Sequence, residues 1–126
     1  MPLLLSYFFS TFLLLAGAHI VAIKFFLYWR FFWFDIPMHL LGGIVIVLGI
    51  AILPFLGIQF FARNNSLTAI LVAVLSIGIA WELFEFVAGI SVFDETLFLD
   101  TGTDLIMDIV GGLLGYGIVR SHKYNM

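Results

Sequence analysis

The chain has 126 residues, of which 63% are hydrophobic and 10% are charged, with a formal net charge of −3 and a mean hydropathy of +1.21. A soluble domain carries about 25% charged residues, so this composition excludes a water-soluble globular protein and indicates a membrane protein. The length suits a single domain, residues 1–126, and the absence of cysteine excludes a disulfide framework. With five basic and eight acidic residues, we expect no nucleic-acid partner.

Two apolar segments in the first half of the chain reach the length of about 20 residues that a membrane-spanning helix needs. The first covers residues 3–26, and because no Lys or Arg precedes it, we expect a retained helix rather than a cleaved signal peptide. An aromatic and basic stretch at 28–34 suits the membrane interface. The second helix is predicted over residues 35–56, with Pro37 accommodated in its first turn.

Two further helices are predicted in the second half. The third covers residues 66–87, with Ser66 as its N-cap and Gly89 as its stop. The fourth begins at 103 or 104 and ends near residue 120. Between them, residues 92–102 are expected to form a solvated connection that holds three acids: Asp94, Glu95 and Asp100. The sequence therefore predicts an all-α membrane protein of four transmembrane helices.

A short internal repeat opens the second and fourth helices. Residues 35–43 and 104–112 share the pattern D-x-x-M-[HD]-[IL]-[LV]-G-G. Both copies begin on the same side of the membrane, which indicates a duplicated helical hairpin with parallel halves. Chance similarity between two apolar helix starts is the alternative, but the paired glycines and the equal acid spacing favour duplication. Five glycines are expected to let these two helices pack closely: Gly42, Gly43, Gly111, Gly112 and Gly115.

Alternating helix directions place all eight acidic residues at one face of the membrane, which we call the site face. Within it, His39, Glu82 and Asp108 fall roughly 6–10 Å below the interface at a rise of 1.5 Å per residue. Spacings of i,i+4 or i,i+3 put a second acid on the same helix face as each of them. Six residues are therefore expected to meet in one pocket: Asp35, His39, Glu82, Glu85, Asp104 and Asp108.

Such a pocket calls for a cation. Each membrane-embedded ionised group costs about 2.5–3.5 kcal/mol on insertion scales. Two like charges 4 Å apart repel by about 4 kcal/mol at an effective dielectric of 20, so either several carboxyl groups are protonated or a cation lies among them. Oxygen ligands with one imidazole suit Mg²⁺, Mn²⁺, Fe²⁺ or Zn²⁺. We expect the six residues to bind a divalent metal ion, with Glu82 and Glu85 as candidates for a general base.

Structural roles are the alternatives. Asp35 and Asp104 suit N-terminal caps, although capping does not extend to Glu82 and Glu85, since acids near a helix C-terminus oppose the helix dipole. His19 falls at a similar depth, where a histidine is more often hydrogen-bonded between helices. Two residues are therefore second-tier candidates: His19 and Asp100.

The acidic motifs resemble those of the VanZ-like and YjdF-like group of small bacterial membrane proteins. The resemblance covers most of the chain after the first helix and rests on Asp35-x-x-x-His39 with Gly42, on Trp81-Glu82-x-x-Glu85, and on Thr101-Gly102-x-Asp104-x-x-x-Asp108 with the glycines that follow. VanZ-like proteins tend to carry Gln in place of Glu85 and an Arg before the last acidic segment, so the match leans towards the YjdF-like side. Some VanZ-like members are associated with glycopeptide resistance, which implies a role near the cell envelope.

Three functional hypotheses follow. The leading one is a metal-dependent hydrolase or transferase that acts on a lipid or lipid-linked envelope substrate, because the pocket lies at headgroup level and carries no nucleophilic Ser or Cys. The second is a proton or cation transporter, which would require a homo-oligomer since four helices are few for a pathway. The third is a non-catalytic membrane protein with a structural metal ion. A bound ion in the purified protein would separate the first and third from the second.

The basic residues predict the topology in the cytoplasmic (inner) membrane. Arg63, Arg120 and Lys123 lie at the face of the two termini, whereas Lys24 and Arg30 lie at the site face. The positive-inside rule therefore places the termini in the cytoplasm and the acidic face outside. Reporter fusions at the C-terminus should report a cytoplasmic location, and an external C-terminus would refute this topology.

Overall fold

Four long helices form the fold of the computed structural model, which describes residues 2–59, 66–90 and 96–124. The long helices are α1 (Pro2–Lys24), α3 (Asp35–Ile52), α4 (Leu67–Ala88) and α5 (Leu97–Tyr124), joined in part by the short α2 (Leu27–Arg30) and the 3₁₀ turn η1 (Leu53–Leu56). Each long helix provides a segment long and apolar enough to cross a membrane: Pro2–Lys24, Asp35–Leu56, Leu67–Ala88 and Phe98–His122. The predicted all-α fold with four spanning helices is thus confirmed.

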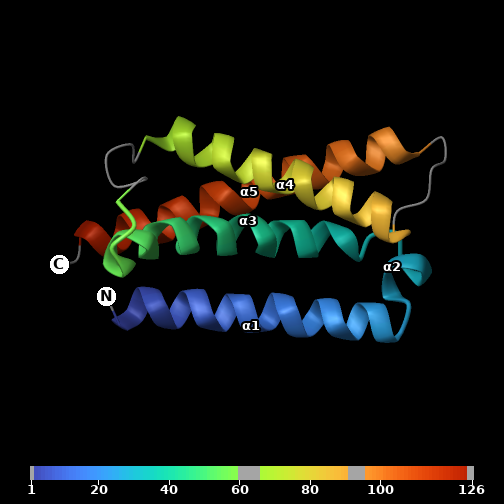
Figure 1. Cartoon of the computed structure of the whole chain (residues 1–126), viewed down its shortest axis with the longest axis horizontal. Helices are drawn as coiled ribbons and strands as arrows, with labels where there is room; N and C mark the ends of the chain where they lie inside the picture. The colour runs from blue at the N-terminus through green and yellow to red at the C-terminus, as the bar shows by residue number, and fades with distance from the viewer. Residues whose placement is uncertain (1, 60–65, 91–95, 125–126) are drawn as a thin grey trace.

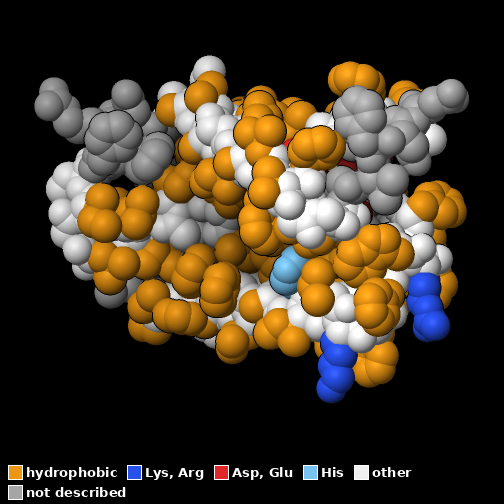
Figure 2. Space-filling model, turned by 45° about the vertical axis from the view of Figure 1, so that its right-hand side comes forward, with side chains coloured by type: hydrophobic (Ala, Val, Ile, Leu, Met, Phe, Trp, Pro, Cys, Tyr) orange, Lys and Arg blue, Asp and Glu red, His pale blue; other side chains and the backbone are white. Residues whose placement is uncertain are grey.

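Helix α3 is the central element of the bundle. The four long helices alternate in direction, so α3 and α5 run parallel, and both termini lie at the end opposite α2 (Figure 1). Helix α3 packs against α1, α4 and α5, and its most extensive contact is with α5. Hydrophobic side chains cover most of the outer surface, and little acidic surface is visible on the face in Figure 2.

Glycines allow α3 and α5 to approach each other at backbone distance. A methyl group added to Gly43 would overlap the backbone carbonyl oxygen of Asp108, and one added to Gly111 would overlap that of Leu40. Further along the same contact, a methyl group on Gly115 would lie 3.0 Å from Cβ of Val47. The predicted close packing of the second and fourth spans through glycine is confirmed, since backbones can touch only where no side chain intervenes.

Apolar clusters fix the half of the bundle that lies towards the termini. Leu4 of α1 packs with Leu48 and Ile52 of α3 in one buried cluster. Val47 packs with side chains of α4 in a second one. Because these clusters occupy the half of the bundle near the termini, the half near α2 remains for the polar side chains.

The predicted ends of the third span are confirmed. Ser66 has an extended backbone conformation, and its hydroxyl accepts a hydrogen bond of 3.2 Å from the backbone N–H of Ala69. The helix stops at Gly89, whose φ of 71° belongs to the left-handed region that glycine adopts at low cost. At the end of α1, by contrast, Phe26 takes up a left-handed conformation with φ of 57°, which nothing in the sequence predicted.

The predicted start of the fourth span was wrong. Helix α5 begins at Leu97, six or seven residues before the expected start. Asp100 lies in its first turn, where an acid favours the helix dipole, and the hydroxyl of Thr103 donates to the carbonyl of Leu99 over 2.8 Å. A single glycine such as Gly102 costs a helix only about 1 kcal/mol, so it does not interrupt α5. Asp94 and Glu95 of the expected connection lie outside the described residues.

The earlier start changes the position of one site residue. Asp104 lies about two turns inside α5 rather than at its N-terminus, and its side chain is buried. A role for Asp104 as an N-terminal cap is therefore excluded, since the unpaired backbone N–H groups lie only in the first turn of a helix.

The α3–α5 contact predicts a strong asymmetry between two glycines of the same helix. Gly111→Ala should destabilise the protein by about 1–3 kcal/mol, because the new methyl group overlaps the Leu40 carbonyl. Gly117→Ala is the matched control, since an added methyl group there meets nothing within 4 Å. Thermal unfolding in detergent should show a lower Tm for Gly111→Ala and an equal or higher Tm for Gly117→Ala. Equal Tm values for the two variants would contradict the packing described.

Candidate metal centre

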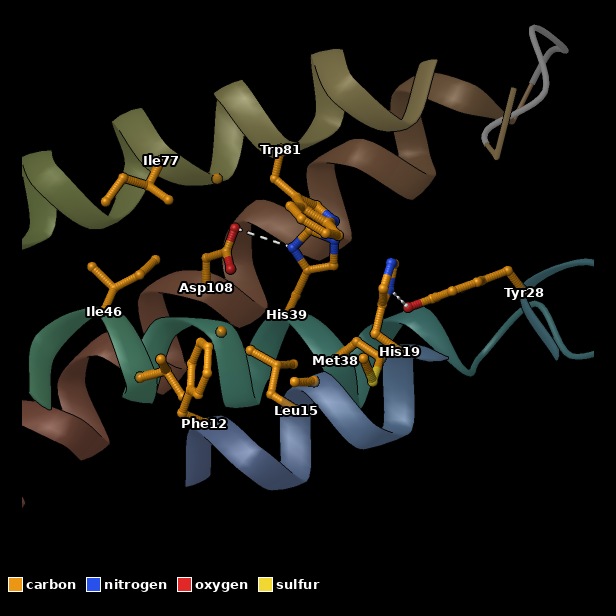
Figure 3. A pocket seen from close by; sticks show the side chains of 14 residues that line it. Phe12, Leu15, His19, Tyr28, Met38, His39, Ile46, Ile77, Trp81 and Asp108 are labelled. Carbon is orange, nitrogen blue, oxygen red and sulfur yellow. Dashed lines mark hydrogen bonds and ion pairs between the residues drawn. The ribbon is translucent and has the colours of Figure 1, made fainter. Parts of the chain in front are cut away.

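The imidazole of His39 lies at the centre of a buried group of carboxylates. The residue occupies the second turn of α3 and is only 4% exposed. Its Nε2 lies 3.3 Å from Oε1 of Glu82 and 3.7 Å from Oδ1 of Asp35. Its Nδ1 lies 3.2 Å from Oδ2 of Asp108 (Figure 3). Both ring nitrogens thus face acidic side chains, and these come from α3, α4 and α5.

Two glutamates of α4 are each held by one hydrogen bond and present their second oxygen to the cluster. Oε1 of Glu85 accepts a hydrogen bond of 2.8 Å from the indole N–H of Trp81. Oε2 of Glu82 accepts one of 2.7 Å from the hydroxyl of Thr101 in α5. The remaining oxygens, Oε2 of Glu85 and Oε1 of Glu82, are buried without a hydrogen-bond partner. Both carboxylates are therefore oriented in advance, with one acceptor atom left available.

Five buried side-chain oxygen and nitrogen atoms in this region have no hydrogen-bond partner, and we call them the donor set because each could be a metal ligand. They are Oδ1 of Asp35, Nε2 of His39, Oε1 of Glu82, Oε2 of Glu85 and Oδ1 of Asp104. Glu85 and Asp104 are each only 1% exposed. Three of the five lie within ion-pair distance, since Nε2 of His39 is 3.3 Å from Oε1 of Glu82 and 3.7 Å from Oδ1 of Asp35. Leaving a buried polar group unsatisfied costs about 1–3 kcal/mol, and more if the group is charged, so the other two, Oε2 of Glu85 and Oδ1 of Asp104, favour an added cation.

The spacing within each of two groups of three side chains fits a cation. Ligand atoms of Asp35, His39 and Glu85 lie within 4.8 Å of one another, as do those of His39, Glu82 and Asp104. Two ligands at about 2.1 Å from an ion lie about 3.0 Å apart in octahedral geometry and about 3.4 Å apart in tetrahedral geometry. The 3.3 Å between Nε2 of His39 and Oε1 of Glu82 falls within that range. The two groups share only His39, so each is a candidate site for one ion beside that imidazole.

The structure brings together all six residues that the sequence singled out, but it gives Asp108 a distinct position. Asp108 contacts Nδ1 of His39, on the other side of the ring from the five unpartnered atoms. Of the second-tier candidates, Asp100 is exposed in the first turn of α5 and belongs to neither group of three. His19 lies beside the centre, not within it.

His19 forms a separate polar pair with Tyr28. Nδ1 of His19 lies 2.8 Å from the Tyr28 hydroxyl, and its ring meets that of Trp81 edge-on, with the centroids 5.3 Å apart. Burial, reinforced by the carboxylates of Asp35 and Glu85, raises the pKa of Tyr28 above its usual range. The phenol therefore keeps its proton and can donate it to His19. The prediction of a histidine hydrogen-bonded between helices describes this residue well.

A cavity of about 330 Å³ adjoins the centre. His39 and Asp108 line one part of it, together with His19, Tyr28 and Trp81. The remaining walls are apolar side chains of α1, α3 and α4, among them Phe12, Ile46 and Ile77 (Figure 3).

Sequence reasoning assigned no role to four residues that shape the centre: Tyr28, Gly78, Trp81 and Thr101. A methyl group at Gly78 would overlap Oδ2 of Asp108, so this glycine gives the carboxylate its space. Gly78 is the single glycine of the apolar α4 and lies one turn before Trp81, so its position in the sequence could have indicated a close contact near the acidic motif. Trp81 and Thr101 stood within the acidic motifs, but their donor roles depend on contacts that only the folded chain reveals.

Comparison with known proteins gives a family but no characterised relative. Neither the curated proteins nor the solved structures provide a significant match to the chain. One family model matches residues 2–123, and it is described as "Predicted membrane protein (DUF2238)". The match covers nearly the whole chain, including all four spanning helices and every residue of the centre. The chain therefore belongs to this family of small membrane proteins.

Proposed function

We propose that this membrane protein binds one divalent cation between α3, α4 and α5, and that the cation supports hydrolysis or group transfer on a lipid or lipid-linked substrate. The observation that carries the proposal is the set of five buried, unpartnered donor atoms around Nε2 of His39. A divalent ion such as Zn²⁺, Mn²⁺, Mg²⁺ or Fe²⁺ would bind the atoms of one group of three, and its charge would also stabilise the neighbouring carboxylates. When bound, such an ion would supply Lewis-acid chemistry at this place.

A protonated His39 is the main alternative to a metal ion. An imidazolium would place one positive charge among the carboxylates, whereas a divalent ion places two there. Five carboxyl groups lie in the region: Asp35, Glu82, Glu85, Asp104 and Asp108. Because like charges 4 Å apart repel by about 4 kcal/mol at an effective dielectric of 20, the larger positive charge offsets more of the repulsion. The charge balance therefore favours the metal ion.

Asp108 is assigned a positioning role in this proposal rather than that of a ligand. Its carboxylate lies 3.2 Å from Nδ1 of His39, so it can accept a hydrogen bond from Nδ1–H. This keeps the proton on Nδ1 and leaves the lone pair of Nε2 for the cation. The candidate oxygen ligands are Asp35 with Glu85, or Glu82 with Asp104. Glu82 and Glu85 remain the candidates for the general base, because the glutamate outside the ligand group keeps one oxygen fixed by a hydrogen bond and the other free to take a proton.

The position of the centre supports a lipid substrate over transport of protons or cations. The centre lies towards the end of the bundle where the aromatic α2 connects α1 to α3, opposite the termini. This end corresponds to the membrane level at which lipids keep their reactive groups. No Asp, Glu, His, Lys or Arg occurs in residues 2–18, 40–62, 64–81 or 109–119. A relay across one chain would thus lack ionisable groups through most of the membrane. A structural metal ion remains the third reading.

Three finer assignments belong to the same proposal. We infer that the protein lies in the cytoplasmic membrane with both termini inside, on the charge distribution given above. We also infer that α3 and α5 derive from a duplicated hairpin, which their parallel packing through Gly43 and Gly111 supports. The resemblance to VanZ-like and YjdF-like proteins agrees with the choice of site residues, and a role at the cell envelope follows from it.

Substitution of His39 tests the proposal. Purified wild-type protein, dialysed against Zn²⁺ or Mn²⁺ in detergent, should retain about one ion per chain by elemental analysis. His39→Leu should lose the ion, because leucine offers no lone pair, although it suits the membrane better. His39→Asp should retain part of the metal content, since an aspartate supplies an oxygen ligand at the same depth.

His122→Leu is the matched control for this series. His122 lies near the end of α5, with its ring 6.0 Å from that of Tyr7 and remote from the centre, so this variant should bind metal as the wild type does. Full metal content in His39→Leu, or no ion in the wild type, would show that the proposed site is wrong.

Asp108 provides a test of the assigned roles. Asp108→Asn should keep the stoichiometry of one ion and weaken its affinity by about 10–100-fold, the usual effect of losing a carboxylate that orients a ligating histidine. Metal titration by isothermal calorimetry measures both quantities. An unchanged Kd would contradict the positioning role, and a complete loss of binding would make Asp108 a ligand.

A further inference from the structure

The cavity beside the centre extends from the polar layer towards the middle of the membrane. On α3 it runs from His39 to Ile46, which corresponds to roughly 10 Å along the helix at 1.5 Å per residue. On α1 it runs over a similar length, from His19 to Phe12. The cavity is therefore elongated along the spans, with its polar groups at the site-face end and apolar side chains deeper in the membrane.

The cavity lies between α1 and α4, which both pack against α3. Helix α1 packs on α3, and α4 packs on α3 and α5, while α1 and α4 have no extensive contact in the described part of the chain. In Figure 3 Leu15 and Phe12 of α1 lie below the space, and Ile77 and Trp81 of α4 lie above it. All three helices are membrane spans, so the medium beside this space is lipid hydrocarbon.

The size and lining of the cavity select its occupant. The cavity has a volume of about 330 Å³ and follows the spans for roughly 10 Å, so it suits a narrow, elongated occupant. Water in a cavity needs two to four polar partners per molecule, which the walls of Phe12, Ile46 and Ile77 do not offer. A single hydrocarbon chain meets both conditions, because it is narrow and apolar.

We propose that this cavity binds one hydrocarbon chain of a membrane lipid, with the polar end of that lipid directed at His39 and Asp108. The occupant must be amphiphilic, because the deep part of the cavity is apolar while its outer part presents two histidines, a phenol and a carboxylate. Binding of the chain stands on the cavity alone. Its role as the substrate pocket rests on the proposed metal-dependent function.

The polar pair of His19 and Tyr28 has a function in this arrangement. The pair lines the cavity at the level of His39 but forms no part of the donor set around Nε2. With Nδ1 of His19 accepting the hydrogen bond from the Tyr28 hydroxyl, the Nε2–H of the same imidazole can donate a hydrogen bond to an ester or phosphate oxygen of a lipid whose chain lies deeper in the cavity. In this arrangement the apolar part of the cavity binds the hydrocarbon chain, and His19 with Tyr28 lies beside the ester or phosphate linkage of the lipid. The metal centre then lies next to the group that reacts.

Filling the cavity tests the inference. Ala16 lines the cavity from α1, and Ala16→Phe places an aromatic ring within it. Gly17→Phe is the matched control, because it adds the same ring to the same helix at an exposed position where an added Cβ meets nothing within 4 Å. Val45→Phe fills the cavity from α3 as an independent second variant. None of these positions lies in the donor set.

The probe is a phosphatidylethanolamine with a photoactivatable diazirine at the middle of one acyl chain. Each protein is reconstituted into vesicles of phosphatidylethanolamine and phosphatidylglycerol that contain this probe, irradiated, and mapped by mass spectrometry. Labelling at Leu15 and Ile46, which line the cavity and are not exposed, should fall at least five-fold in Ala16→Phe and in Val45→Phe, relative to labelling of the exposed Leu114. Gly17→Phe should label as the wild type does.

Three results would overturn the inference: no labelling of Leu15 and Ile46 above that of Leu114 in the wild type, unchanged labelling in both filled variants, or an equal fall in Gly17→Phe. Metal content, measured on the same preparations, separates this inference from the proposed function. A filled variant that keeps its metal and loses the label supports both. A wild type that takes the label but binds no metal overturns the proposed function and leaves chain binding in place.

Discussion

The backbone contact between α3 and α5 brings His39 and Asp108, the central polar groups of this protein, together. Gly43 contacts the carbonyl of Asp108 itself, one turn of helix from His39, so the two helices meet at the level of the centre. With a side chain at Gly43 or Gly111 the helices would separate. The distance of 3.2 Å between Nδ1 of His39 and Oδ2 of Asp108 would then increase. In a lipid solvent, where apolar surfaces gain little from associating, such close packing is a main source of helix association. Helix packing and site geometry are therefore one constraint.

The electrostatics of the centre add to that constraint. Ionisable groups inside a membrane are costly, and the bundle places them where each can be shared with another helix. Glu82 of α4 meets His39 of α3 on one side and Thr101 of α5 on the other. Trp81 holds Glu85 within α4. Hydrogen bonds from neutral donors orient the acids without reducing their charge.

Much of this architecture was accessible from the sequence, because the bilayer restricts the possible structures. Segment length gave four spans, and the cap at Ser66 and the stop at Gly89 followed from local backbone chemistry. Alternating directions were enough to predict that six ionisable residues share a layer. The start of α5 was missed because Gly102 and the acids around it suggest a loop, whereas tertiary contacts from Thr101 and Asp104 keep the helix intact. The space that Gly78 leaves for Asp108, and the left-handed turn at Phe26, depend on contacts that no periodicity encodes.

The order of the helices along the chain has a consequence for biogenesis. Helix α5 carries Asp104, Asp108 and Thr101, and it leaves the ribosome after the three helices that it completes. Until it inserts, His39 and Glu82 stand within the membrane without Asp108 and Thr101, the neighbours to which each is bonded in the finished bundle. The growing chain thus passes through a stage in which intramembrane polar groups lack their final neighbours. The centre is complete only once the last helix is in place.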